Sequence, residues 1–253
     1  MASFTLHSIH TCAAAADRYI NALSKYLPCT LQTLHAHAVL LCPELATFCQ
    51  SNRQSLVGSD KGSAGKLVEF FIFGKKPNCD ANPDLVLADV KATHVKAIGD
   101  AYNAKERLTL TNVGSTDKYE TLQHIVESET LDSCKAYPKV QKGVMAVLVR
   151  NKSRPSMEEI LDEQMVALFY YDLDTLPAEV RATIAADYAN IRNCVAAKAV
   201  SQKGQQYLHI HPHGSKGSKT RAFGFTNKFV TWLICHHTDR ELVKQGRSWV
   251  FRI

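Results

Sequence analysis

A continuous apolar run at residues 143–150 constrains the fold of this chain more than any other feature. The run has the length of a strand and carries no polar side chain before Arg150, so both of its faces should be covered. A second run of this kind spans residues 165–171. Buried strands of this type need helices over them, and residues 177–195 place apolar side chains at helical spacing after a proline. The chain is therefore predicted to form an α/β or α+β core, with a mixed central sheet flanked by helices.

The remaining segments show weaker periodicities in the spacing of their apolar side chains. Apolar spacing and flanking prolines or glycines predict helices over residues 12–27, 30–50 (one or two helices), 66–73, 119–131 and 227–235. Alternation of apolar and polar side chains predicts strands over residues 84–95, 107–113 and 206–211.

The segment from Asn82 to Lys91, NPDLVLADVK, places two carboxylates and an amine on one apolar-flanked strand. Because side chains alternate faces along a strand, Asp89 and Lys91 should point the same way while Val90 points into the packing behind them. Hydrolysis of a phosphodiester at neutral pH needs carboxylate oxygens to hold a divalent cation and a positive charge near the attacking water. The segment contains both, and it predicts a hydrolytic site for phosphodiesters.

The positive charge of the chain is concentrated near its C-terminus. The net charge of the 253 residues is +6, yet residues 201–253 contain nine basic and two acidic side chains, which leaves the rest close to neutral. A basic end on a near-neutral body indicates a polyanion as partner. A charged face that serves only solubility is the alternative, although such faces usually mix both signs.

Cysteine usage and hydropathy indicate the cellular setting. The eight cysteines are scattered without a CxxC pair, which is typical of reduced thiols in an intracellular protein. No apolar run approaches the ~20 residues of a membrane span, and residues 1–16 lack a basic start followed by an apolar core. We therefore expect no membrane association and an intracellular location, either cytoplasmic or, for a virus-encoded protein, inside the host cell.

Five motifs occur in order between about residue 60 and about residue 235. They are DKGSAGKLVE from Asp60, FGKKPNCD from Phe73 followed by PD at 83–84, AKERL from Ala104, YLHIHPH from Tyr207, and a Phe-rich segment with its helix from Lys219 to Ile234. In this order they resemble the MutH-like endonuclease family of the PD-(D/E)xK nuclease superfamily, and most of all its GATC-type type II restriction enzymes. The resemblance implies a restriction-endonuclease-like core with two lobes around a DNA cleft.

The resemblance also implies a role for each site residue. Glu69, Asp84 and Asp89 would bind Mg²⁺, Lys91 would orient or activate the attacking water, and Lys139 would be a further active-site lysine. Three converging carboxylates raise one another's pKa, so such a cluster needs bound cations and lysines beside it. The DNA-binding residues implied are Lys61, His211, His213, Lys216, Lys219, Arg221 and Lys228.

The chain departs from the family pattern at two places. Four residues rather than six separate Asp84 from Asp89, so the turn before the strand must differ. His211-Pro212-His213 stands where the family has Arg-Pro-Lys, and Gly224 stands near a family tyrosine position. An imidazole offers fewer donors to guanine than arginine or lysine does, so recognition of GATC is implied by the resemblance alone.

His209, His211 and His213 alternate along the predicted strand and would share one face. Three imidazoles in this arrangement would suit zinc, so a metal site is an alternative to DNA contact. A polar strand without a ligand is the third interpretation.

Together these features predict a Mg²⁺-dependent type II site-specific deoxyribonuclease that hydrolyses both strands of a short palindromic duplex site. Double-stranded DNA would be its partner, and a homodimer or a transient dimer on DNA would supply two active sites. A MutH-type nicking endonuclease and a DNA-binding module without cleavage are the alternatives. We expect an N-terminal helical segment at 1–58, a catalytic core lobe at 59–150 and a basic DNA-recognition lobe at 151–253.

Overall fold

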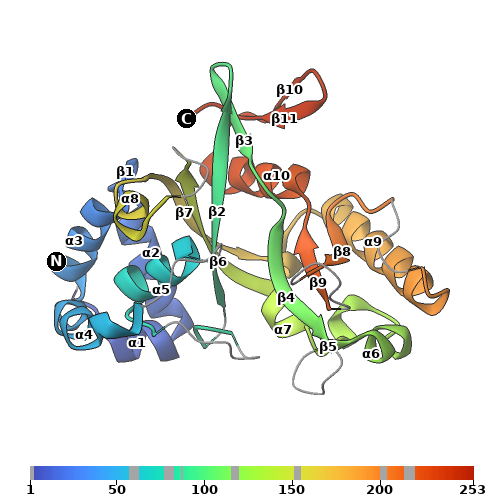
Figure 1. Ribbon diagram of the computed structural model, residues 1–253, viewed down its shortest axis with the longest axis horizontal. Helices are drawn as coiled ribbons and strands as arrows, with labels where there is room; N and C mark the ends of the chain where they lie inside the picture. Colours follow the sequence, from blue (N-terminus) through green and yellow to red (C-terminus); the bar gives the residue numbers. More distant parts are fainter. Residues whose placement is uncertain are drawn as a thin grey trace. The chain divides into compact units, whose positions relative to one another are not determined.

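The computed structural model describes residues 3–56, 63–76, 83–86, 88–114, 120–150, 155–199, 204–213 and 220–253 (Figure 1). It confirms a mixed α/β protein in which helices flank a mixed central sheet. The chain divides into two compact units. The first contains the described residues of Met1–Ala97, Gly143–Tyr171 and Ile253, and the second contains those of Ile98–Lys142 and Asp172–Arg252.

The apolar run at residues 143–150 forms most of β6 (Lys142–Val149) in the first unit, and its residues from Gly143 to Leu148 are buried. The strands of this unit follow the order β1 (Cys29–Thr30), β7 (Gln164–Asp172), β6, β2 (Asp89–Ile98). β2 runs parallel to β6, whereas β1 is antiparallel to β7, so the sheet is mixed (Figure 1).

The helices of the first unit contribute buried side chains to one apolar core. They are α1 (Leu6–Thr11), α2 (Ala13–Ser24), α3 (Leu31–Leu41), α4 (Glu44–Asn52), η1 (Arg53–Leu56), α5 (Ser63–Phe73) and α8 (Met157–Leu161). In α3 the Thr30 side chain accepts the Thr33 N–H at 3.1 Å and caps the helix, and Leu31, Leu34, Ala38 and Leu41 are buried at spacings of three and four. Their common core also contains Val90 of β2 and Val144 of β6.

The second unit is built on a sheet with the order β5 (Glu120–Thr121), β4 (Leu108–Gly114), β9 (Arg221–Phe225), β8 (Leu208–Pro212). The other elements of this unit are β3 (Ala101–Ala104), α6 (Leu122–Glu127), η2 (Leu131–Ser133), α7 (Tyr137–Gln141), η3 (Leu173–Thr175), α9 (Ala178–Ala196), α10 (Asn227–Thr238), β10 (Val243–Gln245) and β11 (Ser248–Val250).

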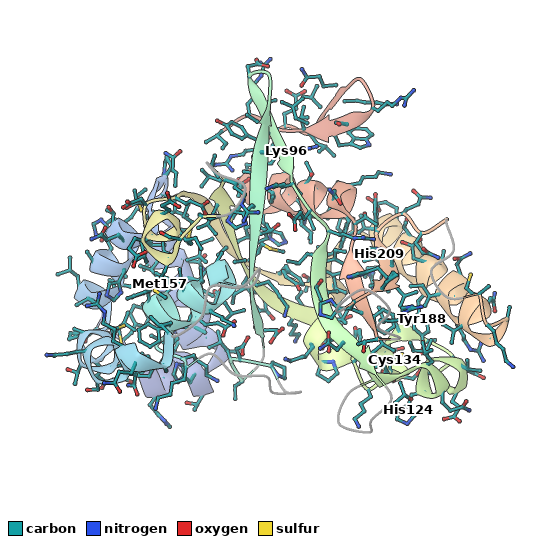
Figure 2. The ribbon with its side chains drawn as sticks, in the orientation of Figure 1. Lys96, His124, Cys134, Met157, Tyr188 and His209 are labelled. Atoms are coloured by element: carbon teal, nitrogen blue, oxygen red, sulfur yellow. The ribbon has the colours of Figure 1, made fainter. Side chains whose placement is uncertain are left out.

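Helix α9 confirms the helical pattern that the sequence predicts after Pro177. Its buried side chains include Val180, Ile184, Tyr188, Ile191 and Val195. The Tyr188 hydroxyl lies 2.8 Å from Cys134 Sγ and donates to the Ser128 carbonyl, which fastens the helix inside the second unit (Figure 2). Asp187 accepts the backbone N–H groups of residues 206–208 at 2.6–2.9 Å and so fixes the start of β8.

Several boundaries differ from the predicted ones. The strand predicted from residue 84 begins at Asp89, because Leu85 and Ala88 bond to each other in a turn instead of to a neighbouring strand. The predicted helix at 119–131 is the shorter α6 followed by η2. The two units interleave in sequence, because strands from distant parts of the chain pair in each sheet. The three consecutive segments expected from the sequence, 1–58, 59–150 and 151–253, stay a prediction. In the described ranges, no helix combines the length and the hydropathy needed to cross a bilayer.

Candidate active site

The turn before β2 places Asp84 at the start of that strand. Leu85 and Ala88 exchange backbone hydrogen bonds of 2.9 and 3.3 Å, which closes the turn. Asp84 is 8% exposed, and its Oδ2 accepts the Val90 N–H at 3.0 Å. The short spacing between Asp84 and Asp89 predicts a turn that differs from the family pattern. In the structure this turn folds back, so that the Asp84 carboxylate contacts Val90, the second residue of β2.

Asp89 and Lys91 meet on one face of β2. Their side chains form an ion pair, with Asp89 fully buried and the Lys91 side chain 17% exposed. Val90 between them is buried in the core on the other face. The strand alternation predicted from the sequence is therefore confirmed.

The Asp84 and Asp89 carboxyl groups interact directly with each other. Burial, the charge of Asp89 and a hydrogen bond between the two side chains raise the pKa of Asp84. The Val90 N–H and the Lys91 ammonium act in the opposite direction, because both favour the ionised carboxylate. Without a bound metal ion, ionising both Asp84 and Asp89 at once is therefore unfavourable. A divalent cation would remove this conflict.

Glu69 lies on α5, and its Oε1 is 4.0 Å from the position that a Cβ on Gly65 would take. Among the described residues, no three His, Cys, Asp or Glu side chains lie close enough together to hold a metal ion. The three-carboxylate set predicted from the sequence is therefore not assembled here. The structure brings Asp84, Asp89 and Lys91 together and leaves Glu69 outside a group of metal-ligand geometry.

The other predicted site residues lie in the second unit or outside the described residues. Lys139 is half-buried on α7. Arg221 begins β9, and Lys228 in the first turn of α10 places its ammonium 5.3 Å from the centre of the Tyr207 ring. Three predicted DNA contacts fall outside the described residues, namely Lys61, Lys216 and Lys219.

His209 and His211 share one face of β8, as the sequence predicts, but they are buried. Their rings stack with centroids 4.7 Å apart, and the side chains are 8% and 6% exposed. His213 is half-buried, with its ring 6.3 Å from that of His211 and nearly perpendicular to it. Because no three such side chains in the described part of the chain form a metal-binding group, the zinc alternative finds no support. A contact between DNA and the His211 ring would require that ring to be uncovered.

Gly224 lies opposite His209 across β8 and β9. A Cβ at this position would lie 2.7 Å from the Leu108 carbonyl oxygen and 2.9 Å from His211 Cε1. The glycine that departs from the family pattern is therefore required by the close approach of strand β4 and the histidine pair.

The buried pair His209 and His211 is expected to make the stability of the folded protein depend on pH. Burial, together with the nearby Arg107 guanidinium, lowers the pKa of both imidazoles to about 4. Between about pH 6.5 and pH 4 the unfolded chain binds protons that the folded chain does not, so stability should fall as the pH falls through this window. The expected loss is on the order of 3 kcal/mol per imidazole.

Thermal unfolding midpoints of the wild type and His209→Gln between pH 4 and pH 7.5 test this expectation. The variant should lose less stability on acidification, because the other titrating groups are common to both proteins. His7→Gln, a change at an exposed histidine, is the control and should follow the wild-type curve. Parallel curves for His209→Gln and the wild type would contradict the expectation.

No known protein-family model matches this chain, and no curated protein sequence matches it either. The chemistry that the chain can perform is therefore indicated by the geometry at the start of β2. The sequence identifies three residues that meet there, Asp84, Asp89 and Lys91. It does not reveal Tyr171 of β7, whose ring lies over Gly143, the residue that pairs with Asp89. A buried tyrosine in an apolar run carries no signal of its own in the sequence.

Proposed function

We propose that the chain is a Mg²⁺-dependent, site-specific DNA endonuclease that acts inside a cell and hydrolyses phosphodiester bonds in a short palindromic duplex site. The observation that carries the proposal is the buried Asp84–Asp89 carboxyl pair with the Lys91 ammonium against it at the start of a core strand. Perturbed, coupled carboxyl groups of this kind concentrate at functional sites. The ordered motifs that resemble the MutH-like endonucleases support the same function, and on this proposal the central sheet is a PD-(D/E)xK nuclease core.

The residues present fit Mg²⁺. This ion is usually held by one or two carboxylates, with waters and substrate phosphate oxygens completing its coordination. Asp84 and Asp89 provide two such carboxylates, and their mutual repulsion would be relieved by a cation. When bound, Mg²⁺ would neutralise developing negative charge and make a coordinated water more acidic.

The chain's own residues would orient the reacting groups and stabilise negative charge. Asp84 is held in place by the Val90 N–H, so its carboxylate is already oriented. Asp89 keeps the Lys91 ammonium at the site, and that ammonium would stabilise negative charge on the attacking oxygen and on the phosphate. Lys139 is proposed to help position the phosphate.

The basic second unit is proposed to hold the DNA. Arg221 and Lys228 lie in this unit, and such side chains contact phosphates without reading sequence. Half-buried His213 is the better placed of the two predicted histidines for a direct contact, since His211 is covered. Cutting both strands of a palindrome would use two copies of the chain, as a stable or a transient dimer.

Plasmid digestion tests this function directly. We expect supercoiled plasmid to become linear fragments with Mg²⁺ and to remain intact with EDTA, and sequencing the fragment ends would identify the site. Open circles alone would indicate a nicking enzyme instead. A plasmid that is shifted on a gel but never cut, with or without Mg²⁺, would indicate a DNA-binding module and contradict the proposal.

A further inference from the structure

Tyr171 lies against the backbone at the position that pairs with Asp89. In the parallel pairing of β2 with β6, Asp89 is opposite Gly143. A Cβ on Gly143 would lie 2.5 Å from Tyr171 Cε1 and 2.6 Å from both Cζ and Oη. The phenol end of the tyrosine therefore occupies the space that any other residue at 143 would fill, immediately beside the Asp89 backbone.

The same tyrosine interacts electrostatically with the Asp89 carboxylate. Both side chains are fully buried. Burial and then the negative charge of Asp89 raise the pKa of Tyr171 far above its ordinary value. Paired residues of neighbouring strands point their side chains to the same face of a sheet, so the Tyr171 ring over Gly143 lies on the face that carries the Asp89 side chain.

We infer that Tyr171 is a positioning residue for Asp89, and that its phenol holds the Asp89 carboxylate in the orientation that a divalent cation requires. The inference rests on the proposed function, because it concerns the same site. Lys91 restrains Asp89 from the solvent side, where its ammonium is partly exposed. Tyr171 would restrain it from the buried side, over β6. Gly143 has no side chain and so lets the ring reach this position.

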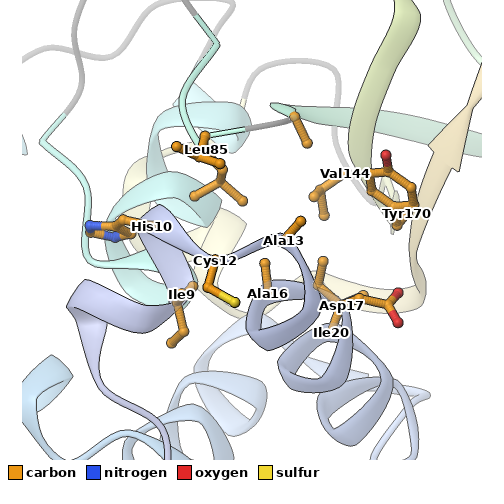
Figure 3. A pocket seen from close by; sticks show the side chains of 12 residues that line it. Ile9, His10, Cys12, Ala13, Ala16, Asp17, Ile20, Leu85, Val144 and Tyr170 are labelled. Atoms are coloured by element: carbon orange, nitrogen blue, oxygen red, sulfur yellow. The ribbon is translucent and has the colours of Figure 1, made fainter.

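Tyr170, the preceding residue of β7, provides a matched control. It lines an apolar cavity of about 120 Å³ together with Leu85 and Val144 (Figure 3). Val144 belongs to the core beneath Val90, so Tyr170 and Tyr171 face opposite sides of the sheet. Tyr170→Phe removes the same hydroxyl from the same strand without changing the side that carries Asp89.

The experiment compares the wild type, Tyr171→Phe and Tyr170→Phe without DNA. Titration calorimetry with Mn²⁺ should show affinity about 10- to 100-fold weaker for Tyr171→Phe and unchanged for Tyr170→Phe, since removing a group that orients a ligand typically has this effect. In cleavage assays the Mg²⁺ concentration for half-maximal rate should rise by a similar factor, with the rate at saturating Mg²⁺ nearly restored. A tyrosine with a merely structural role would lower the thermal midpoint and leave Mn²⁺ affinity unchanged.

Gly143→Ala is a second, independent variant. It keeps the hydroxyl but forces the ring away from Asp89, so it should also weaken Mn²⁺ binding. Wild-type Mn²⁺ affinity in folded Tyr171→Phe, or in folded Gly143→Ala, would overturn the inference while leaving the proposed function standing. A wild type that neither binds Mn²⁺ nor cuts DNA would overturn the proposed function, and this inference with it.

Discussion

Replacing Asp89 with asparagine is expected to reduce Mg²⁺-dependent cleavage by a factor on the order of 10³ while leaving the fold intact. The amide has nearly the shape of the carboxylate, so the packing around this fully buried side chain should survive. It has no negative charge, however, and the site would lose one of the two carboxylates that it brings together. The Lys91 ammonium would also lose its ion-pair partner.

The measurement is the rate of plasmid linearisation with Mg²⁺, together with a gel shift in Ca²⁺ to show that DNA binding is retained. Asp17→Asn provides the control, because Asp17 is an exposed carboxylate on α2 of the same unit. Cleavage by Asp89→Asn within about tenfold of the wild-type rate, a difference of only ~1.4 kcal/mol in the barrier, would show that Asp89 is not part of the chemistry.

The same variant should change how stability depends on pH. Asp84 has a higher pKa when folded than when unfolded, so its contribution is full at low pH and is lost as the pH rises through the folded pKa. The charge of Asp89 and its hydrogen bond to Asp84 both contribute to that shift, after burial. In the metal-free protein, Asp89→Asn should therefore lose less stability than the wild type between pH 4 and pH 8.

Features with a local physical cause could be predicted from the sequence. The face of α9 that contains Ile184 and Tyr188 follows from a periodicity of 3.6 residues, and burial of β6 follows from an uninterrupted apolar run. The meeting of Asp89 with Lys91 follows from the alternation of a strand, which places residues two apart on one side. These inferences need no knowledge of what packs against each element.

Features that depend on distant parts of the chain could not be predicted. Glu69 follows the family spacing, yet its position depends on how α5 packs in the first unit, and the structure does not group it with Asp84 and Asp89 as a set of three metal ligands. The alternation at His209 and His211 is visible in the sequence, but their burial depends on the surrounding tertiary packing. The contact of Tyr171 with Gly143 joins two strands and has no local pattern.

Replacing Lys91 with methionine is expected to lower cleavage by about 10²- to 10³-fold, because the site loses the positive charge proposed to stabilise the attacking oxygen. Methionine keeps most of the length of the side chain without the ammonium. It should also destabilise the metal-free protein by about 3 kcal/mol at pH 8, since removing one partner of a buried ion pair leaves the other charge uncompensated. The loss should be smaller at pH 5, where Asp84, whose pKa is raised to about 6, takes up a proton and leaves less uncompensated negative charge.

Chemical denaturation at pH 5 and pH 8, with and without Mg²⁺, separates the two effects of Lys91→Met. A cation bound by Asp84 and Asp89 would replace the missing charge, so Mg²⁺ should recover most of the stability of the variant but not its cleavage rate. Lys96→Met is the control, because Lys96 is an exposed lysine on the same strand (Figure 2). If Lys91→Met cuts DNA at the wild-type rate, the lysine only balances charge in the folded protein, and the water-activating role must belong to another group.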